Sequence, residues 1–194
     1  DFIIDKKDAK KTIKILLENN YSYSVNMPKQ PGYIKHYPRM TKNECVSAIE
    51  VHLEMTLQKF SSIFNYQIIK SQLRKKGVFT LLSYQDQIAH TIINKQLNDD
   101  GYLHQNIALR NYYDLFLLSY KADTLKSIKL FPKTLKQLNS FLSIASIIFP
   151  NTESILFEKN ASSIQHQKSI LKLLNTPKKH RQKNQKLKIK LLHT

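Results

Sequence analysis

The segment 47–54, with the sequence SAIEVHLE, alternates apolar and polar side chains, and this period of two constrains the fold more than any other feature of the chain. Such alternation is typical of a strand that buries one face. The two faces carry Ile49, Val51 and Leu53 on one side and Glu50, His52 and Glu54 on the other. Glu50 and His52 would lie about 7 Å apart along the strand. Two interpretations follow: an amphipathic strand with solvated polar residues, or a strand that presents a carboxylate and an imidazole to a cleft.

The composition is that of a globular protein. Hydrophobic residues make up 41% of the chain and charged residues 23%. Its length of 194 residues suits one ordinary domain or a domain with a small appendage. No apolar run approaches the length needed to cross a bilayer, so we expect a soluble protein with no membrane partner. Cys45 is the single cysteine, so no disulfide can form within the chain. A reducing, cytoplasmic setting is therefore expected.

The chain is strongly basic, with a net charge of +17. Seven of the positive charges lie between Lys178 and the end of the chain, where no acid occurs. A positive surface attracts phosphates, nucleic acid or acidic partners, so this basic tail, 177–194, is a candidate nucleic-acid arm. The alternative is that lysines of a chain rich in Lys, Ile and Asn accumulate on solvated faces without a ligand.

Turn residues and periodicity divide the chain into a mixed part and a helical part. For the mixed part, 1–57, we expect in order a buried strand at 2–4, a helix at about 9–19, a short strand at 21–25, a Pro-rich connection at 27–40 and the Glu50 strand. The next part, 58–176, carries apolar residues at helical spacing, with boundaries at Pro132, Pro150 and Pro177. The sequence therefore predicts an α+β fold: a small mixed sheet with flanking helices, then a helical region.

One helix of the second part, expected over about 104–121, is predicted to bury a broad apolar face. This face would consist of Ile107, Leu109, Tyr113, Phe116, Leu117 and Tyr120. Arg110 and Asp114 lie four residues apart on the same helix, so we expect a salt bridge that positions the two parts. A substrate contact through Arg110 is the alternative.

Several kinds of active site find no support in the sequence. None of the three glycines stands in a phosphate-binding loop, no HExxH occurs, and no serine has the context of a nucleophile elbow. Carboxylates on strands remain: Asp1 opens one strand and Glu50 lies within another. If the two strands are neighbours in a sheet, both carboxylates could share a divalent cation such as Mg²⁺, which prefers oxygen ligands and retains phosphate oxygens in its shell.

Four stretches, in this order, resemble one protein family. The start DFIIDKKDA, with a helix that ends at Asn19-Asn20-Tyr21, looks like the second half of an Asp-x-Asp strand and its following helix in the DNA polymerase beta-like nucleotidyltransferase superfamily. The other stretches are similar to an uncharacterised bacterial subfamily of it: HYP at 36–38 before IEVHL at 49–53, YQDQIAH at 84–90 and LRNYYDL at 109–115. The resemblance covers about residues 1–120.

The resemblance implies a set of site residues. In the family a Gly-Ser loop grips the triphosphate of an NTP, and an Asp-x-Asp pair and a third acid hold two metal ions. Asp1 would be the second Asp and Glu50 the third acid, which makes both catalytic residues and ligands of Mg²⁺ or Mn²⁺. His52 and Arg110 would contact the nucleotide. The Gly-Ser loop and the first Asp do not occur in the chain, which begins without an initiator Met, so we expect an N-terminal segment to be missing.

Two functions are therefore expected from the sequence. In the first, the protein transfers a nucleoside monophosphate from an NTP to an acceptor hydroxyl, on a small molecule, an RNA end or a protein side chain, and leaves pyrophosphate. In the second, it is a non-catalytic module whose helical body and basic tail bind RNA or DNA. The net charge, the ten tyrosines and the lack of the Gly-Ser segment favour the second.

Overall fold

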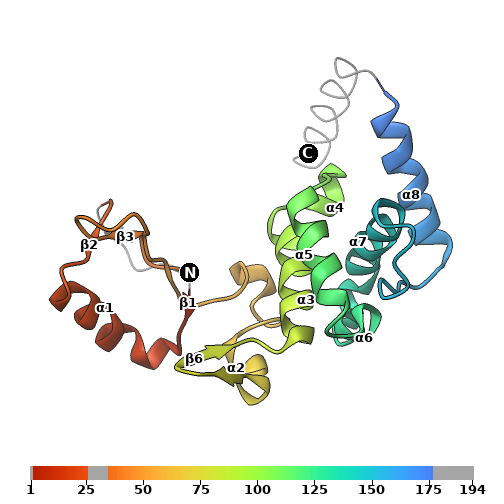
Figure 1. The fold of residues 1–194 in the computed structure, drawn as a ribbon. Helices are drawn as coiled ribbons and strands as arrows, with labels where there is room; N and C mark the ends of the chain where they lie inside the picture. Colours follow the sequence, from red (N-terminus) through yellow and green to blue (C-terminus); the bar gives the residue numbers. More distant parts are fainter. Residues whose placement is uncertain (1, 26–34, 177–194) are drawn as a thin grey trace. The chain divides into compact units, whose positions relative to one another are not determined.

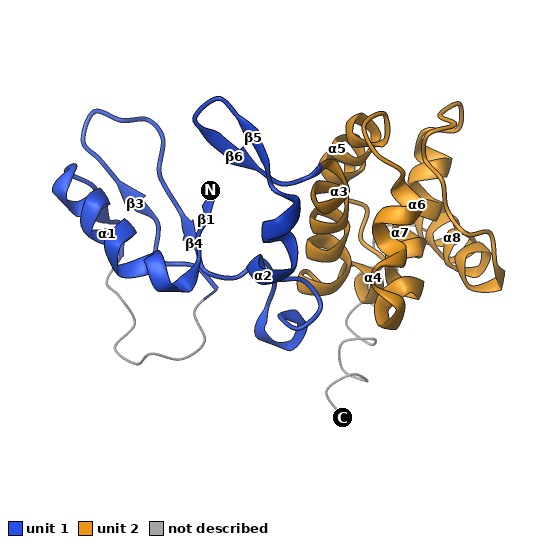
Figure 2. Cartoon of the chain, turned by 90° about the horizontal axis from the view of Figure 1, so that it is seen from below, with its two compact units in different colours: residues 1–83 blue, residues 84–194 orange. Residues whose placement is uncertain are grey.

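The computed structural model describes residues 2–25 and 35–176. The chain forms two compact units, residues 1–83 and residues 84–194 (Figure 2). The first combines short strands with helices and the second is helical, so the predicted α+β class is confirmed. The boundary follows Ser83. Residues 58–83, which the sequence prediction grouped with the helical region, therefore belong to the first unit.

The first unit opens with a strand, a tight turn and a helix. Strand β1 (Phe2–Ile3) leads into a 3₁₀ turn at Lys6–Asp8 and then into α1 (Ala9–Glu18), shown in red in Figure 1. The Asp5 side chain accepts a hydrogen bond from the backbone N–H of Lys7, 3.2 Å away, and so caps this turn. The strand is less buried than its sequence predicted, because Phe2 is exposed at the surface.

Three further strands follow: β2 (Ser22–Tyr23), β3 (Met40–Thr41) and β4 (Val51–His52). With β1 they form two two-stranded sheets, which an isolated bridge joins into one small mixed sheet. Strand β1 pairs parallel with β4, and β2 pairs antiparallel with β3. Backbone hydrogen bonds in both directions between Met40 and Ile49, each 2.8 Å, join the two pairs. The joined strands therefore include one parallel pair, β1 with β4, and one antiparallel pair, β2 with β3.

The alternation in the segment 47–54 is the reason that this sheet has one buried face. Val51 and Met40 are fully buried and form a core cluster with Ile13 of α1. Ile4, Leu16, Tyr21, Tyr23, Tyr37 and Ile49 pack around it, partly buried. One side of the sheet is thus occupied by the apolar face of α1, which leaves the alternate side chains of β4 for the other side.

The rest of the first unit is built from short elements. In order they are a 3₁₀ turn at Gln58–Phe60, α2 (Tyr66–Ile69), a second 3₁₀ turn at Lys70–Gln72, and the strands β5 (Arg74–Lys76) and β6 (Phe79–Leu81). The two strands form an antiparallel hairpin. Gly77 lies in its turn with φ at 60°, in the left-handed region that glycine adopts without strain.

The second unit is helical. Its helices are α3 (Tyr84–Ile93), α4 (Gly101–His104), α5 (Leu109–Ser119), α6 (Thr124–Lys129), α7 (Leu135–Ile148) and α8 (Ala161–Leu174). A π-helical turn at Asn94–Asn98 follows α3 directly. Helix α7 carries a continuous run of buried residues from Leu138 to Ala145 and packs against α6 and α8. None of the described helices combines the length and the apolar character that crossing a bilayer requires.

Helix α5 buries a different face from the one predicted. Leu109, Tyr113, Leu117 and Tyr120 are exposed, whereas Tyr112, Leu115 and Ser119 are buried. The Tyr112 ring stacks on Phe141 of α7, with centroids 4.1 Å apart. The Ser119 hydroxyl shares a hydrogen bond of 2.7 Å with that of Ser154. The predicted face is wrong because the stripe that is buried contains Ser119, which is satisfied by a hydrogen bond to a second hydroxyl. Hydrophobic periodicity counts a serine as polar and so places it on the exposed face.

Candidate functional site

The polar cluster around Glu50 is set by how residues 36–41 pair with 49–52. Two isolated antiparallel bridges join Met40 to Ile49 and His36 to His52. Three residues separate the bridged positions on one strand and two on the other, so the pairing contains a bulge. Pro38 lies within it and has no backbone N–H to give to the ladder. The bulge allows a histidine rather than Tyr37 to pair with His52.

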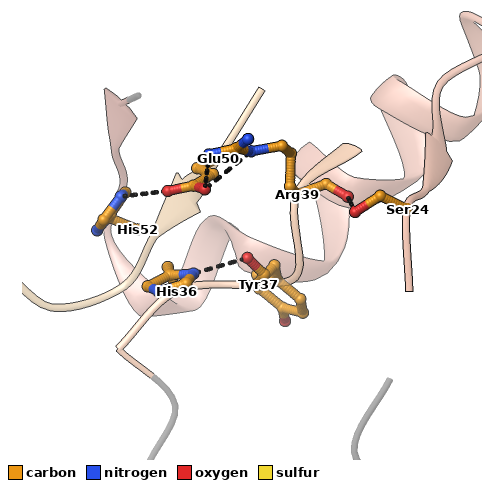
Figure 3. A network of polar contacts seen from close by, with 6 residues as sticks. All are labelled: Ser24, His36, Tyr37, Arg39, Glu50 and His52. Carbon is orange, nitrogen blue, oxygen red and sulfur yellow. Dashed lines mark hydrogen bonds and ion pairs between the residues drawn. The ribbon is translucent and has the colours of Figure 1, made fainter. Parts of the chain in front are cut away.

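Arg39 is the main partner of the Glu50 carboxylate. Its Nε and Nη2 atoms donate to Glu50 Oε1 over 3.1 and 2.9 Å (Figure 3). The Met40–Ile49 bridge accounts for this contact, because the residues before Met40 and after Ile49 are direct cross-strand neighbours. The Arg39 side chain is mostly exposed and that of Glu50 is mostly covered. The guanidinium thus covers the Glu50 carboxylate on the side that faces solvent.

His52 lies on the other side of the carboxylate. Its Nε2 atom is 3.6 Å from Glu50 Oε2, and its ring lies 4.9 Å from the ring of His36, centroid to centroid. Nδ1 of His36 is 2.9 Å from the carbonyl oxygen of Tyr37 (Figure 3). One carboxylate, one guanidinium and two imidazoles therefore meet on the sheet face that α1 leaves uncovered.

The environment shifts the pKa of two of these groups. Burial raises the pKa of the Glu50 carboxyl, but the hydrogen bonds and charge of Arg39, with smaller contributions from His36 and His52, outweigh it and hold the pKa below its ordinary value. Burial lowers the pKa of His52, and the charges of His36 and Lys35 lower it further, while Glu50 partly opposes them. The cluster therefore favours an ionised carboxylate beside a neutral imidazole.

Glu54 does not take the solvated position that strict alternation predicts. It is buried and forms an ion pair with the exposed Lys6 in the turn before α1. The regular strand ends at His52, and Leu53 and Glu54 both donate their backbone N–H groups to the carbonyl of Lys35. The change in backbone direction after His52 turns Glu54 inward, where it ties the end of β4 to the start of α1.

Glu50 fits the chemistry of a Mg²⁺ ligand, since it is an ionised oxygen donor and its Oε2 atom accepts no hydrogen bond from Arg39. The imidazoles are poor ligands for this hard cation. Within residues 2–25 and 35–176, no group of three or more His, Cys, Asp or Glu side chains is arranged to hold a metal ion. Among the described residues, Glu50 is therefore not part of a preformed cluster of potential metal ligands.

The predicted site residues have three different outcomes. Glu50 directly precedes β4 and His52 lies within it, and their side chains meet, as the spacing of two residues predicted. Asp1, the other expected ligand, lies outside the described residues, as does the basic tail 177–194. Arg110 is exposed near the start of α5 in the second unit, and no ion pair joins it to Asp114 in the described part of the chain.

Arg39 and His36 are the members of the cluster to which the sequence prediction gave no role. The prediction treated 27–40 as an irregular connection, so no residue of it had an assigned partner. A cation and a carboxylate at equal distances from the Met40–Ile49 bridge were a usable signal, but only once this antiparallel register was known.

Comparisons with protein-family models, curated proteins and solved structures found no match to this chain.

Proposed function

We propose that this chain carries part of a nucleotidyl-transfer site centred on Glu50. The observation that supports this most is the parallel pairing of β1 with β4, in which Phe2 is in register with Val51 and its N–H donates to the carbonyl of Glu50 over 3.1 Å. In a parallel pair, residues that immediately precede two registered positions belong to one face. In general, two carboxylates on adjacent strands at such places can share a cation.

The proposed reaction transfers a nucleoside monophosphate. The acceptor hydroxyl loses its proton to water, and its oxygen forms a bond to the α-phosphorus of an NTP. The bond from that phosphorus to the bridging oxygen breaks, and pyrophosphate leaves. Glu50 and Asp1 would hold Mg²⁺ or Mn²⁺, which when bound neutralises phosphate charge and lowers the pKa of the acceptor hydroxyl. Arg39 lowers the pKa of the Glu50 carboxyl and so favours its ionised form, and the imidazole of His52 would contact the nucleotide from the same face.

Mn²⁺ binding, followed by electron paramagnetic resonance with and without an NTP, tests the site in the chain itself. We expect Glu50→Gln to weaken Mn²⁺ binding by at least about 10-fold, because the amide keeps the shape and loses the charge. Glu44→Gln is the matched control, since Glu44 is an exposed acid of the same unit. Equal affinity of the Glu50→Gln variant and the unchanged protein would exclude Glu50 as a ligand.

Transfer is measured as pyrophosphate release that depends on an acceptor. The family pattern includes a Gly-Ser loop and a first Asp, neither of which is in the printed sequence. The assay is therefore run with this chain and with any longer chain that its reading frame encodes. We expect activity that Glu50→Gln abolishes and Glu44→Gln retains. Metal binding without transfer in either form would contradict the proposed reaction while leaving the metal site intact.

A further inference from the structure

The hairpin of β5 and β6 exposes apolar side chains together with lysines. Val78 is 93% exposed and Phe79 is 68% exposed, and every residue from Lys75 to Leu81 is exposed. A two-stranded hairpin with neither face covered has little stability of its own. Large apolar side chains at its tip therefore indicate a surface that acquires a partner.

The register of the hairpin sorts these side chains onto its faces. Lys76 is paired with Phe79, and Arg74 with Leu81, so both pairs lie on one face, while Lys75 and Thr80 lie on the other. Arg74 donates from Nε to the carbonyl of Leu82, 3.1 Å away, and so helps to hold the base of the hairpin. An open hollow on the apolar face is lined by Lys76, Gly77, Val78, Phe79 and Leu81.

The charge on this element has a single sign. The segment 70–82 contains four basic residues and no acid, in a chain whose net charge is +17. A polyanion is the partner that such a surface attracts. An aromatic ring directly beside an ammonium group also matches one kind of polyanion, since the ring stacks on a base while the ammonium binds the neighbouring phosphate.

An anionic membrane fits the same surface less well. Lys76 and Phe79 flank the two-residue turn at equal distances from the tip. Insertion deep enough to bury the Phe79 ring would carry the Lys76 ammonium toward the hydrocarbon, which is unfavourable. Stacking on a base leaves the ammonium in water beside a phosphate.

We propose that the β5–β6 hairpin binds single-stranded nucleic acid. In this complex Phe79 stacks on a base and the Lys76 ammonium binds a phosphate.

The test uses the absence of tryptophan from the chain. In a Phe79→Trp variant the indole is the only one present, so its emission reports on the hairpin tip alone. An oligouridine of roughly 12 nucleotides, within the range of single-strand sites, is titrated into the full chain without NTP or divalent cation. We expect saturable quenching of the indole by base stacking. Vesicles of anionic phospholipid are titrated in parallel and should leave the emission unchanged.

Anisotropy of a labelled oligouridine gives the affinity of each variant. We expect Phe79→Ser to bind roughly 5- to 150-fold more weakly and Phe79→Trp to bind at least as well as the unchanged protein. Lys76→Gln should reduce the slope of log affinity against log salt by about 0.7. Val46→Ser and Lys129→Gln are controls, since both alter exposed side chains at other places and should leave binding unchanged.

Two outcomes would overturn the proposal. In the first, Phe79→Ser binds the oligonucleotide as tightly as the unchanged protein, or the indole emission stays constant while anisotropy rises, which places binding elsewhere on the chain. In the second, vesicles shift the indole emission to the blue and the oligonucleotide has no effect, which identifies a membrane as the partner. Because neither measurement uses an NTP or a metal ion, the result is independent of the proposed nucleotidyl transfer.

Discussion

At the scale of single residues, Arg39 lowers the pKa of the Glu50 carboxyl. Its guanidinium contributes two hydrogen bonds and a positive charge to one carboxylate oxygen. We expect Arg39→Gln to raise the pKa of the Glu50 carboxyl, because burial, which opposes ionisation, then acts with less opposition. The free energy of unfolding should fall by only about 1 kcal/mol or less, since the arginine is largely exposed. The carboxyl ¹³C chemical shift of Glu50 followed against pH checks the direction, with Lys42→Gln as the control variant of the same unit.

His52 makes the first unit sensitive to mild acid. Its pKa in the folded state lies below the ordinary value of 6.5, so the unfolded chain binds more protons at intermediate pH. Folding is therefore destabilised as the pH falls from above 6.5 toward the folded-state pKa. Glu50, whose folded pKa is depressed, adds a further loss of stability only at lower pH, below its ordinary 4.5. We expect His52→Asn to lower stability at neutral pH but to flatten its dependence between about pH 7.5 and pH 5.

Urea unfolding of the two proteins at several pH values measures this difference. His104→Gln, in the second unit, serves as the control for the loss of a histidine. A pH dependence that His52→Asn leaves as steep as before would show that His52 does not cause it.

At the scale of the elements, substitutions in helix α5 can test which of its two apolar stripes is buried. Leu115 is fully buried and Leu117 is about half exposed, although the two residues are chemically identical. We expect Leu115→Ala to reduce the free energy of unfolding by about 2–5 kcal/mol. Leu117→Ala should change it by about 0.5 kcal/mol or less. Urea denaturation followed by circular dichroism compares them, and equal losses would contradict the burial of this helix.

The same helix shows why sequence predicted some elements better than others. The segment 47–54 has a single apolar face, so alternation predicted correctly that Val51 is buried and that Glu50 and His52 share the other face. Helix α5 has apolar residues nearly all round it, so periodicity could not choose between its stripes. The choice depends on the tertiary contacts of Tyr112 and Ser119, whose partners Phe141 and Ser154 lie in other segments.

The residues of the candidate site also differ in whether the sequence alone could predict them. Glu50 and His52 could be found from the sequence, because a local spacing of two residues places them on one face. Arg39 and His36 could not, since their partners depend on an antiparallel register and on a bulge at Pro38. Glu54 was misplaced because a strict alternation was extended past His52, where the strand ends and the chain turns.

At the scale of the whole molecule, each of the two units has buried apolar residues of its own. Leu138 lies in the buried stretch of α7, and Val51 lies in the cluster beneath the mixed sheet. We expect Leu138→Ala to increase amide hydrogen exchange within 84–176 and to leave exchange in the sheet of the first unit unchanged. Val51→Ala should have the converse effect. Exchange followed by mass spectrometry separates the two regions, and a loss of protection spread equally over both units in either variant would show that they unfold as one.

The parallel pairing of β1 with β4 also affects the order in which the chain can fold. In the second unit, α7 packs on its sequence neighbours α6 and α8, whereas α3 packs on the later helices α5 and α6. Strand β1 finds its partner only after α1, β2 and β3 have intervened, and such distant pairing closes a long loop and is slow. During synthesis, Phe2 leaves the ribosome well before Val51 has been added. The pairing of β1 with β4 is therefore expected to be a late step in the folding of the first unit.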